Sequence, residues 1–205
     1  MVKLKLNNST KNGIQKLLKE LLNYAYKWHD IDVKCTYVKM ESFNNPDALP
    51  NKMNFFTIDE FKQFISVVDD FKYKVYYEML YYCGLRKEEA NALNWNDILF
   101  DTHNVSIIKS MTTKIKGEKY VILPPKTKNS RRLLPMPKVL ENDLKLLYTE
   151  YSKYDNFDMN WFVFGGIFPL SDTTIAEKKN KYCKIAKVKE IRIHDFRHST
   201  ASLLI

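Results

Sequence analysis

Four residues of this chain, in three separate segments, have side chains suited to binding an anion. His194 and Arg197 lie three positions apart, a spacing that places both on one face of a helix. Both donate hydrogen bonds to anions, and an arginine keeps its charge at any working pH. Arg86 lies at an expected junction between two helices, and Lys126 at an expected tight turn between two strands. We interpret the set as a phosphate-binding site whose members meet in one basic cleft.

Each segment also has a plain structural explanation. Arg86 could be a surface arginine near a helix start, paired with Glu89 or braced by it. Lys126 could simply be solvated at a turn. His194 and Arg197 could be satisfied by Asp195, which could cap the helix or orient a neighbour. The segment around Lys126 is strongly basic, however, and contains one acid, Glu118, as suits a surface that follows a phosphate backbone.

The composition limits the classes of protein to which the chain can belong. Its 205 residues carry 33 Lys and Arg against 24 Asp and Glu, a net charge of +9. Nucleic acid is the favoured partner, ahead of an acidic membrane surface, and a merely lysine-rich soluble protein is the alternative. Cys35, Cys83 and Cys183 form no CxxC pair, so we expect core cysteines in a reducing cytoplasm. No signal peptide or membrane-spanning stretch is expected.

Hydrophobic spacing and turn residues predict the elements that position these side chains. Helices are expected over residues 10–29, 73–83, 138–153 and 172–188, with a short helix after Arg86 and a last one from about His194. Residues 57–60 form a capping-box pattern, Gly84 is a helix stop, and residues 40–54 resemble a linker. Strands are expected over residues 105–108, 120–123 and 132–136, with residues 126–130 as a hairpin turn.

The ordered set Gly-Leu-Arg-x-x-Glu, a lysine in a basic turn, and His-x-x-Arg resembles the tyrosine recombinases of the phage integrase family. The resemblance runs from Thr57 to Ile205, and residues 10–40 look like the end of that family's core-binding domain. It implies a mixed α+β, mainly helical catalytic domain with a small three-stranded antiparallel sheet. The implied domains are residues 1–42, the C-terminal part of a helical core-binding domain; 43–55, a linker; and 56–205, an incomplete catalytic domain.

The resemblance also implies a chemistry, in which a tyrosine attacks DNA and forms a 3′-phosphotyrosine. Arg86 and Arg197 would clamp the phosphate, His194 would assist proton transfer, and Lys126 would protonate the departing 5′-oxygen. No metal, ATP or other cofactor is expected. Supporting roles would fall to Glu89, Asp195 and His198, and the expected DNA contacts are Lys114, Lys116, Lys128, Arg131 and Arg132.

The chain departs from the family pattern at its end. The family has a further His or Trp box and then the tyrosine beyond His-x-x-Arg, whereas this sequence stops eight residues after Arg197. We therefore expect a truncated chain that is inactive alone, with its nucleophile outside these residues. The full-length protein is expected to act on double-stranded DNA as a homotetramer on paired sites. Its expected setting is a bacterial cytoplasm, encoded by a prophage or mobile element, with no membrane partner.

Three other interpretations remain open from the sequence. The chain could be a non-catalytic DNA-binding remnant of a recombinase, or a relative of type IB topoisomerases. It could also be a plain helical protein whose basic charge binds RNA or acidic partners.

Overall fold

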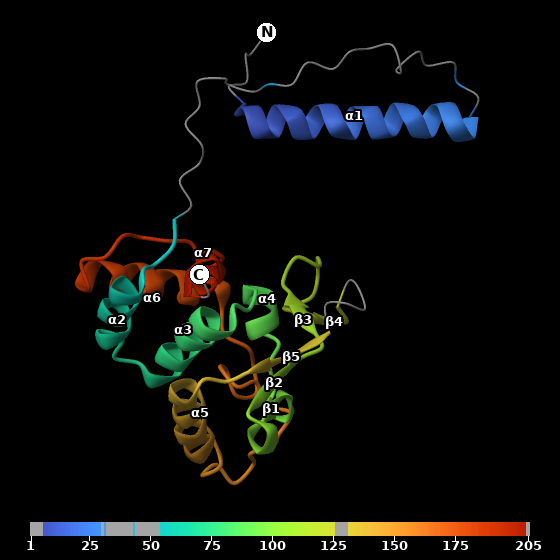
Figure 1. Ribbon diagram of the computed structural model, residues 1–205. Helices are drawn as coiled ribbons and strands as arrows, with labels where there is room; N and C mark the ends of the chain where they lie inside the picture. Colours follow the sequence, from blue (N-terminus) through green and yellow to red (C-terminus); the bar gives the residue numbers. More distant parts are fainter. Residues whose placement is uncertain (1–5, 30, 32–42, 44–53, 126–130, 204–205) are drawn as a thin grey trace. The chain divides into compact units, whose positions relative to one another are not determined.

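The computed structural model describes residues 6–29, 31, 43, 54–125 and 131–203. The chain separates into two compact units, residues 1–52 and 53–205. The first unit contains helix α1 (Asn8–His29), which confirms the helix expected over residues 10–29 (Figure 1). Asn7 Oδ1 accepts the backbone N–H of Thr10 at 2.8 Å and so caps the first turn. The expected linker, residues 40–54, lies almost wholly outside the described residues.

Helices are the main elements of secondary structure in the second unit. They are α2 (Ile58–Ser66), α3 (Phe71–Cys83), α4 (Lys87–Ala90), α5 (Lys138–Tyr151), α6 (Asp172–Ile185) and α7 (Asp195–Leu203). Two short 3₁₀ turns, η2 (Trp95–Asp97) and η3 (Phe100–Thr102), flank the first strand. Within the described part of the chain, no helix combines the length and the apolar character needed to cross a bilayer.

The predicted helix ends follow local hydrogen bonding. Thr57 Oγ1 accepts the N–H of Glu60, and Glu60 Oε2 accepts the N–H of Thr57, which completes the expected capping box. Helix α6 ends three residues before the predicted end at residue 188. Lys187 adopts a left-handed conformation with φ 52°, and Val188 N–H donates to the Cys183 carbonyl at 3.1 Å. This Schellman arrangement closes the helix although no glycine marks its end.

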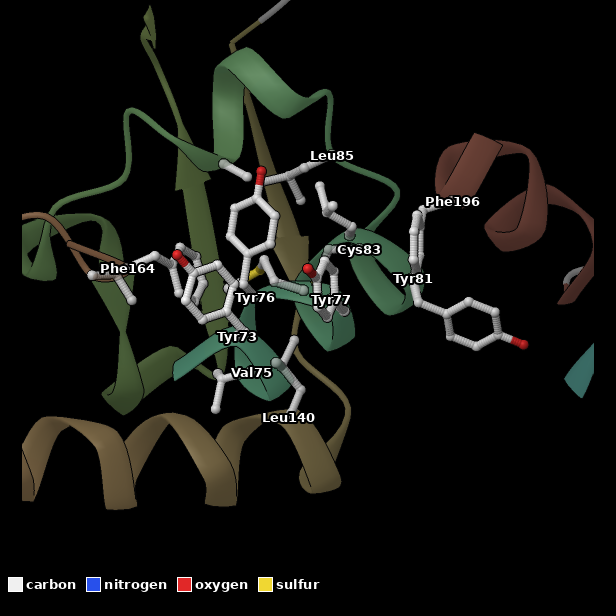
Figure 2. Packing of buried hydrophobic residues seen from close by; sticks show 14 of the residues in the cluster. Tyr73, Val75, Tyr76, Tyr77, Tyr81, Cys83, Leu85, Leu140, Phe164 and Phe196 are labelled. Atoms are coloured by element: carbon white, nitrogen blue, oxygen red, sulfur yellow. The ribbon is translucent and has the colours of Figure 1, made fainter. Parts of the chain in front are cut away.

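Helix α3 forms the centre of the second unit. Figure 1 shows it between α2 and α7 on one side and α5 on the other, and it packs against all three. Val75, Tyr76, Tyr77 and Leu80 of α3 have no exposed surface. Figure 2 shows Val75, Tyr76 and Tyr77 among the packed side chains of the core. The ring of Phe196 from α7 stacks on Tyr77 with centroids 5.7 Å apart. The buried aromatic faces thereby fix α7 against α3. Cys83 and Cys183 are buried, as expected, and Cys35 lies outside the described residues.

The strands form two small antiparallel sheets. The three-stranded sheet has the order β1-β2-β5, from β1 (Ile98–Leu99), β2 (Asn104–Ile107) and β5 (Arg132–Pro135). The two-stranded sheet pairs β3 (Ser110–Thr112) with β4 (Val121–Leu123). In the register of the larger sheet, Ile107 pairs with Arg132 and Val105 with Leu134. Arg132 is therefore the first residue of a strand whose position the sheet determines.

The predicted hairpin between residues 120–123 and 132–136 is wrong. These segments are strands β4 and β5, but they belong to different sheets, and residues 126–130 between them lie outside the described residues. Strand β4 instead pairs with β3, which the sequence did not predict because Ser110–Thr112 has a single apolar residue, whereas Val121–Leu123 is wholly apolar. The β3–β4 connection includes Gly117, whose φ of 92° suits a turn. After β4, Pro124 and Pro125 end the strand, because proline has no N–H to donate to a neighbouring strand.

Candidate phosphate-binding site

Arg86 and Glu89 form a tight turn at the start of α4. The backbone N–H of Arg86 donates to Glu89 Oε2 at 2.9 Å, and Arg86 Nη1 donates to Oε1 at 3.1 Å. Glu89 is 6% exposed, whereas the side chain of Arg86 is 49% exposed. The buried carboxylate thus holds one edge of a guanidinium group that is open to solvent.

Arg132 reaches the same carboxylate from strand β5. Its Nη1 donates to Glu89 Oε1 at 3.0 Å and its Nη2 donates to Oε2 at 2.8 Å, a two-point pairing. Burial on its own raises the pKa of Glu89, but hydrogen bonds from Arg132 and Arg86 outweigh burial and hold the pKa below its usual value. Glu89 is therefore a carboxylate at neutral pH.

Arg197 reaches this region from helix α7. Its Nη1 donates to the Gly84 carbonyl at 2.6 Å, two residues before Arg86. Gly84 ends α3 in a left-handed conformation, with φ 59°, and a Cβ there would lie 3.2 Å from Thr200 of α7. The absence of a side chain at residue 84 therefore lets α7 approach the end of α3, and this approach brings Arg197 beside Arg86.

The three arginines act on one another electrostatically. Burial lowers the pKa of Arg197, and the positive charges of Arg86 and Arg132 lower it further. An arginine nonetheless stays charged at neutral pH. Three guanidinium groups and the Glu89 carboxylate leave two net positive charges in this cluster, which suits an anion that carries two negative charges.

The residues around the start of α7 form a second turn. His194 lies just before the helix, so the shared helical face predicted for it and Arg197 is wrong in detail. The exposed His194 ring meets the ring of His198 edge to face, with centroids 5.3 Å apart. Asp195, 1% exposed, accepts the backbone N–H of Arg192 at 2.8 Å and Arg192 Nη2 at 2.9 Å. Burial raises the pKa of Asp195, but these bonds outweigh it, and the net shift is downward.

The structure thus brings together some of the predicted site residues. Arg86, Arg197 and Glu89 meet, while Lys126 and Lys128 lie outside the described residues. The remaining expected DNA contacts divide into two kinds. Lys114, Lys116 and Arg131 are exposed, but Arg132 directs both terminal nitrogens at Glu89. Among the residues that the structure describes, no group of His, Cys, Asp or Glu side chains is placed to hold a metal ion.

Comparison with known proteins identifies the family. Residues 54–205 match the phage integrase family. The chain belongs to this family. It is also 33% identical over 214 residues to the ICEBs1 integrase of Bacillus subtilis (strain 168), covering 98% of the chain and 55% of that relative. The chain therefore spans about half the length of the curated relative it matches.

Solved structures of other members of the family have the same fold. The Tn1549 transposon integrase in complex with transposon right end DNA matches with a TM-score of 0.78 at 20% identity, over 98% of this chain and 67% of that one. The XerH recombinase bound to its difH substrate matches with a TM-score of 0.60 at 20% identity, over 98% and 55% of the two chains. The expected mainly helical fold of a tyrosine-recombinase catalytic domain, with small antiparallel sheets, is confirmed.

Two contacts of this family member escaped sequence analysis. The first is the pairing of Arg132 with Glu89, 43 positions away, for which the sequence offers no local signal. The second is the pairing of Arg192 with Asp195, for which the sequence does offer a local signal. Arg192-x-x-Asp195 repeats the spacing of Arg86-x-x-Glu89. Asp195 is the first residue of α7, and Glu89 lies in the first turn of α4.

Proposed function

We propose that this chain is part of a site-specific recombinase or integrase that cuts and rejoins double-stranded DNA through a 3′-phosphotyrosine intermediate. The observation that carries the proposal is the cluster of Arg86, Arg132 and Arg197 around Glu89. When an oxygen attacks a phosphodiester, the phosphorane-like transition state gains a second negative charge. Preformed guanidinium groups stabilise that charge where it develops, and the cluster has two net positive charges to offer.

In the proposed reaction, a tyrosine oxygen attacks phosphorus and the 5′-oxygen of the next nucleotide leaves. Arg86 and Arg197 bind the nonbridging oxygens, and His194 takes part in proton transfer at the nucleophile. Lys126 gives a proton to the departing 5′-oxygen. A 5′-hydroxyl of the partner strand then attacks the phosphotyrosine, reforms the phosphodiester and releases the tyrosine, so that no outside energy source is consumed. Asp195 and His198 have supporting roles beside His194: Asp195 follows it in the chain, and the His198 ring contacts the His194 ring.

The attacking tyrosine is proposed to come from outside residues 1–205. The phenols of α3 are poor nucleophiles, because burial raises the pKa of Tyr81 to about 12 and raises those of Tyr76 and Tyr77 as well. Tyr77 also donates its hydroxyl to the Ile175 carbonyl at 2.9 Å. Core packing accounts for these tyrosines.

The basic surface is proposed to bind duplex DNA, with Lys114, Lys116, Lys128 and Arg131 along the phosphate backbone. The Tn1549 and XerH structures are complexes with DNA, which supports this partner. Paired recombination sites would be bridged by a homotetramer of the full-length protein in the cytoplasm of a bacterial host. DNA affinity should fall steeply with salt, and replacing one phosphate-binding side chain by a neutral one should reduce the logarithmic salt slope by about one.

A nicked suicide duplex, in which the cleaved strand diffuses away, tests the chemistry. The product of the whole gene should form a covalent protein–DNA adduct that survives denaturation, and its Arg86→Lys and Arg197→Lys variants should not. The 205-residue chain alone should bind DNA without forming an adduct. An adduct at one of its own tyrosines would contradict the proposed origin of the nucleophile.

The same assay separates the other interpretations. A non-catalytic DNA-binding remnant would show salt-dependent binding but no adduct even from the whole gene product. A type IB topoisomerase relative would relax supercoiled plasmid of any sequence, whereas a recombinase would require its own paired sites.

A further inference from the structure

Glu89 connects two arginines that come from different parts of the fold. We propose that Arg132 is a positioning residue, which fixes the guanidinium of Arg86 through Glu89 and does not itself contact the DNA backbone. The inference deepens the proposed function, because it rests on Arg86 as a ligand of the scissile phosphate.

The Glu89 carboxylate is shared unequally between the two arginines. Arg132 occupies both oxygens, at 3.0 and 2.8 Å, with its two terminal nitrogens. Arg86 uses one guanidinium nitrogen, Nη1, together with its backbone N–H. Within the described part of the chain, Nε and Nη2 of Arg86 have no hydrogen-bond partner. Arg86 can therefore keep its bond to Glu89 and still bind a phosphate oxygen, whereas both terminal nitrogens of Arg132 are already engaged.

Exposure divides the two arginines in the same way. The Arg132 side chain is 25% exposed and that of Arg86 is 49% exposed. A DNA backbone approaching this surface meets the more exposed guanidinium first. Arg132 is the less exposed of the two, and it pairs with a carboxylate side chain that is 7% exposed.

The backbone around Arg132 is well placed for holding Glu89. Arg132 begins β5 and pairs with Ile107 of β2, so the three-stranded sheet determines its position. Glu89 lies in α4, which follows directly from the end of α3. The two-point pairing therefore joins the sheet to α4. Without it, the carboxylate would keep only its bonds to Arg86, a residue of the same turn, and could rotate together with it.

The first test needs no DNA. In the 205-residue chain, the side-chain Nε–H signal of Arg86 can be followed by ¹⁵N NMR and assigned from its loss in Arg86→Lys. In Arg132→Gln, we expect this signal to shift and its order parameter to drop while backbone signals of α3 and α5 stay in place. In Arg132→Lys, which keeps a charged donor at residue 132, the order parameter of the Arg86 signal should lie between the native value and that of Arg132→Gln. An Arg86 signal unchanged in Arg132→Gln would overturn the proposal.

The second test is a double-mutant cycle on affinity for duplex DNA at fixed salt. If Arg132 acts through Glu89, Arg132→Gln should weaken binding about fivefold in the native background but less than about twofold in Glu89→Gln. Arg131→Gln is the matched reference, because Arg131 is exposed, adjacent, and proposed to contact DNA directly. Its effect should be equal in both backgrounds. An Arg132 effect that is also equal in both would mean a direct phosphate contact and would overturn the proposal.

The two tests fail in different ways. If the native chain does not bind duplex DNA at all, the proposed function is wrong, and the NMR result still decides whether Arg132 orders Arg86. If Arg132→Gln is unfolded, as its thermal melt and amide spectrum would show, Arg132→Lys replaces it in both experiments with the same expected direction. An Arg86 order parameter in Arg132→Lys equal to the native one, with an additive effect on affinity, would then reject the proposal.

Discussion

Two turns in the second unit, one at Arg86 and one at Arg192, are built from an arginine followed three residues later by an acid. In each turn the acid accepts the arginine's own backbone N–H, at 2.9 Å for Glu89 and 2.8 Å for Asp195. Each acid also accepts the arginine's guanidinium and is almost fully buried. The two turns therefore share the same backbone hydrogen bond. Their guanidinium contacts differ, because Arg86 uses Nη1 alone and Arg192 uses both Nε and Nη2.

Their surroundings differ. Glu89 is bound by a second guanidinium from β5, and Arg197 lies close enough for the charges of Arg86 and Arg132 to depress its pKa. The side chain of Arg192, by contrast, is 81% exposed, although the Asp195 carboxylate with which it pairs is buried. The Arg-x-x-acid turn is thus a way to begin a helix. A partner from a distant strand converts the turn at Arg86 into a charged cluster.

The largest expected difference between the two turns is in stability. Glu89→Ala removes the one carboxylate among three guanidinium groups, and we expect it to lower the free energy of unfolding by about 3 kcal/mol, at the lower end of the range for breaking a buried pair because Arg86 is half exposed. Asp195→Ala loses a helix-start hydrogen bond and should cost about 1 kcal/mol. Urea unfolding followed by circular dichroism measures both.

Glu88→Ala is the control for this comparison, because Glu88 is exposed and adjacent to Glu89. Its effect should stay within about 0.5 kcal/mol. Equal losses in Glu89→Ala and Asp195→Ala would mean that the partners from β5 and α7 add nothing to the turn at Arg86.

The pH dependence of stability separates guanidinium pairing from burial. Glu78 is as buried as Glu89, at 2% exposed, but its neighbours are Lys74 and Asp143. Burial, helped by the charge of Asp143, raises the pKa of Glu78 to about 8, whereas the pKa of Glu89 is lowered. The folded chain therefore binds the extra proton at Glu78, and the unfolded chain binds it at Glu89.

These directions predict opposite slopes. The Glu78 contribution should be lost as pH rises from about 4.5 to about 8, by up to about 5 kcal/mol. The Glu89 contribution should be present above about pH 4.5 and lost as pH falls through the folded pKa. The free energy of unfolding should be measured from pH 3 to 9. Its dependence on pH should become weaker above about pH 4.5 in Glu78→Gln and below about pH 4.5 in Glu89→Gln. Flattening on the same side in both variants would contradict the assignment.

Gly84 tests whether the approach of α7 is what brings Arg197 into the cluster. Gly84→Ala places a Cβ 3.2 Å from Thr200 and strains a left-handed residue, so we expect a loss of about 1–2 kcal/mol and weaker DNA binding. Gly117→Ala is the matched control, because Gly117 also has a positive φ but open space around its Cα. It should show only the conformational cost, about 1 kcal/mol. Similar unfolding free energies and DNA affinities for the two variants would exclude a role for the close approach.

The sequence predicts the local features of this fold well. The capping box at Thr57, the stop at Gly84 and the helix that contains Tyr76 depend on residues near one another in the chain, and all are found. The short strands were harder. Strand β3 has only one apolar residue to mark it, and the pairing of β4 with β3 depends on which segments meet in space.

The candidate site divides along the same line. Arg86, Glu89 and Arg197 could be predicted from the sequence, because they belong to the short motifs Gly-Leu-Arg-x-x-Glu and His-x-x-Arg. The structure brings these three residues together. The role of Arg132 could not, because in the sequence it is one basic residue in a basic segment. Its partner becomes visible only when β5 is placed in the sheet beside β2.

The smallest expected effect is that of Arg192→Gln. It removes the guanidinium bonds to Asp195 but keeps the backbone N–H that Asp195 accepts, so the start of α7 should remain closed. The melting temperature should fall less than in Arg132→Gln, and the Arg86 side-chain signal should not move. If Arg192→Gln instead disorders Arg86 as strongly as Arg132→Gln does, the two turns are coupled through α7. Arg132 would then not be a specific positioning residue for Arg86.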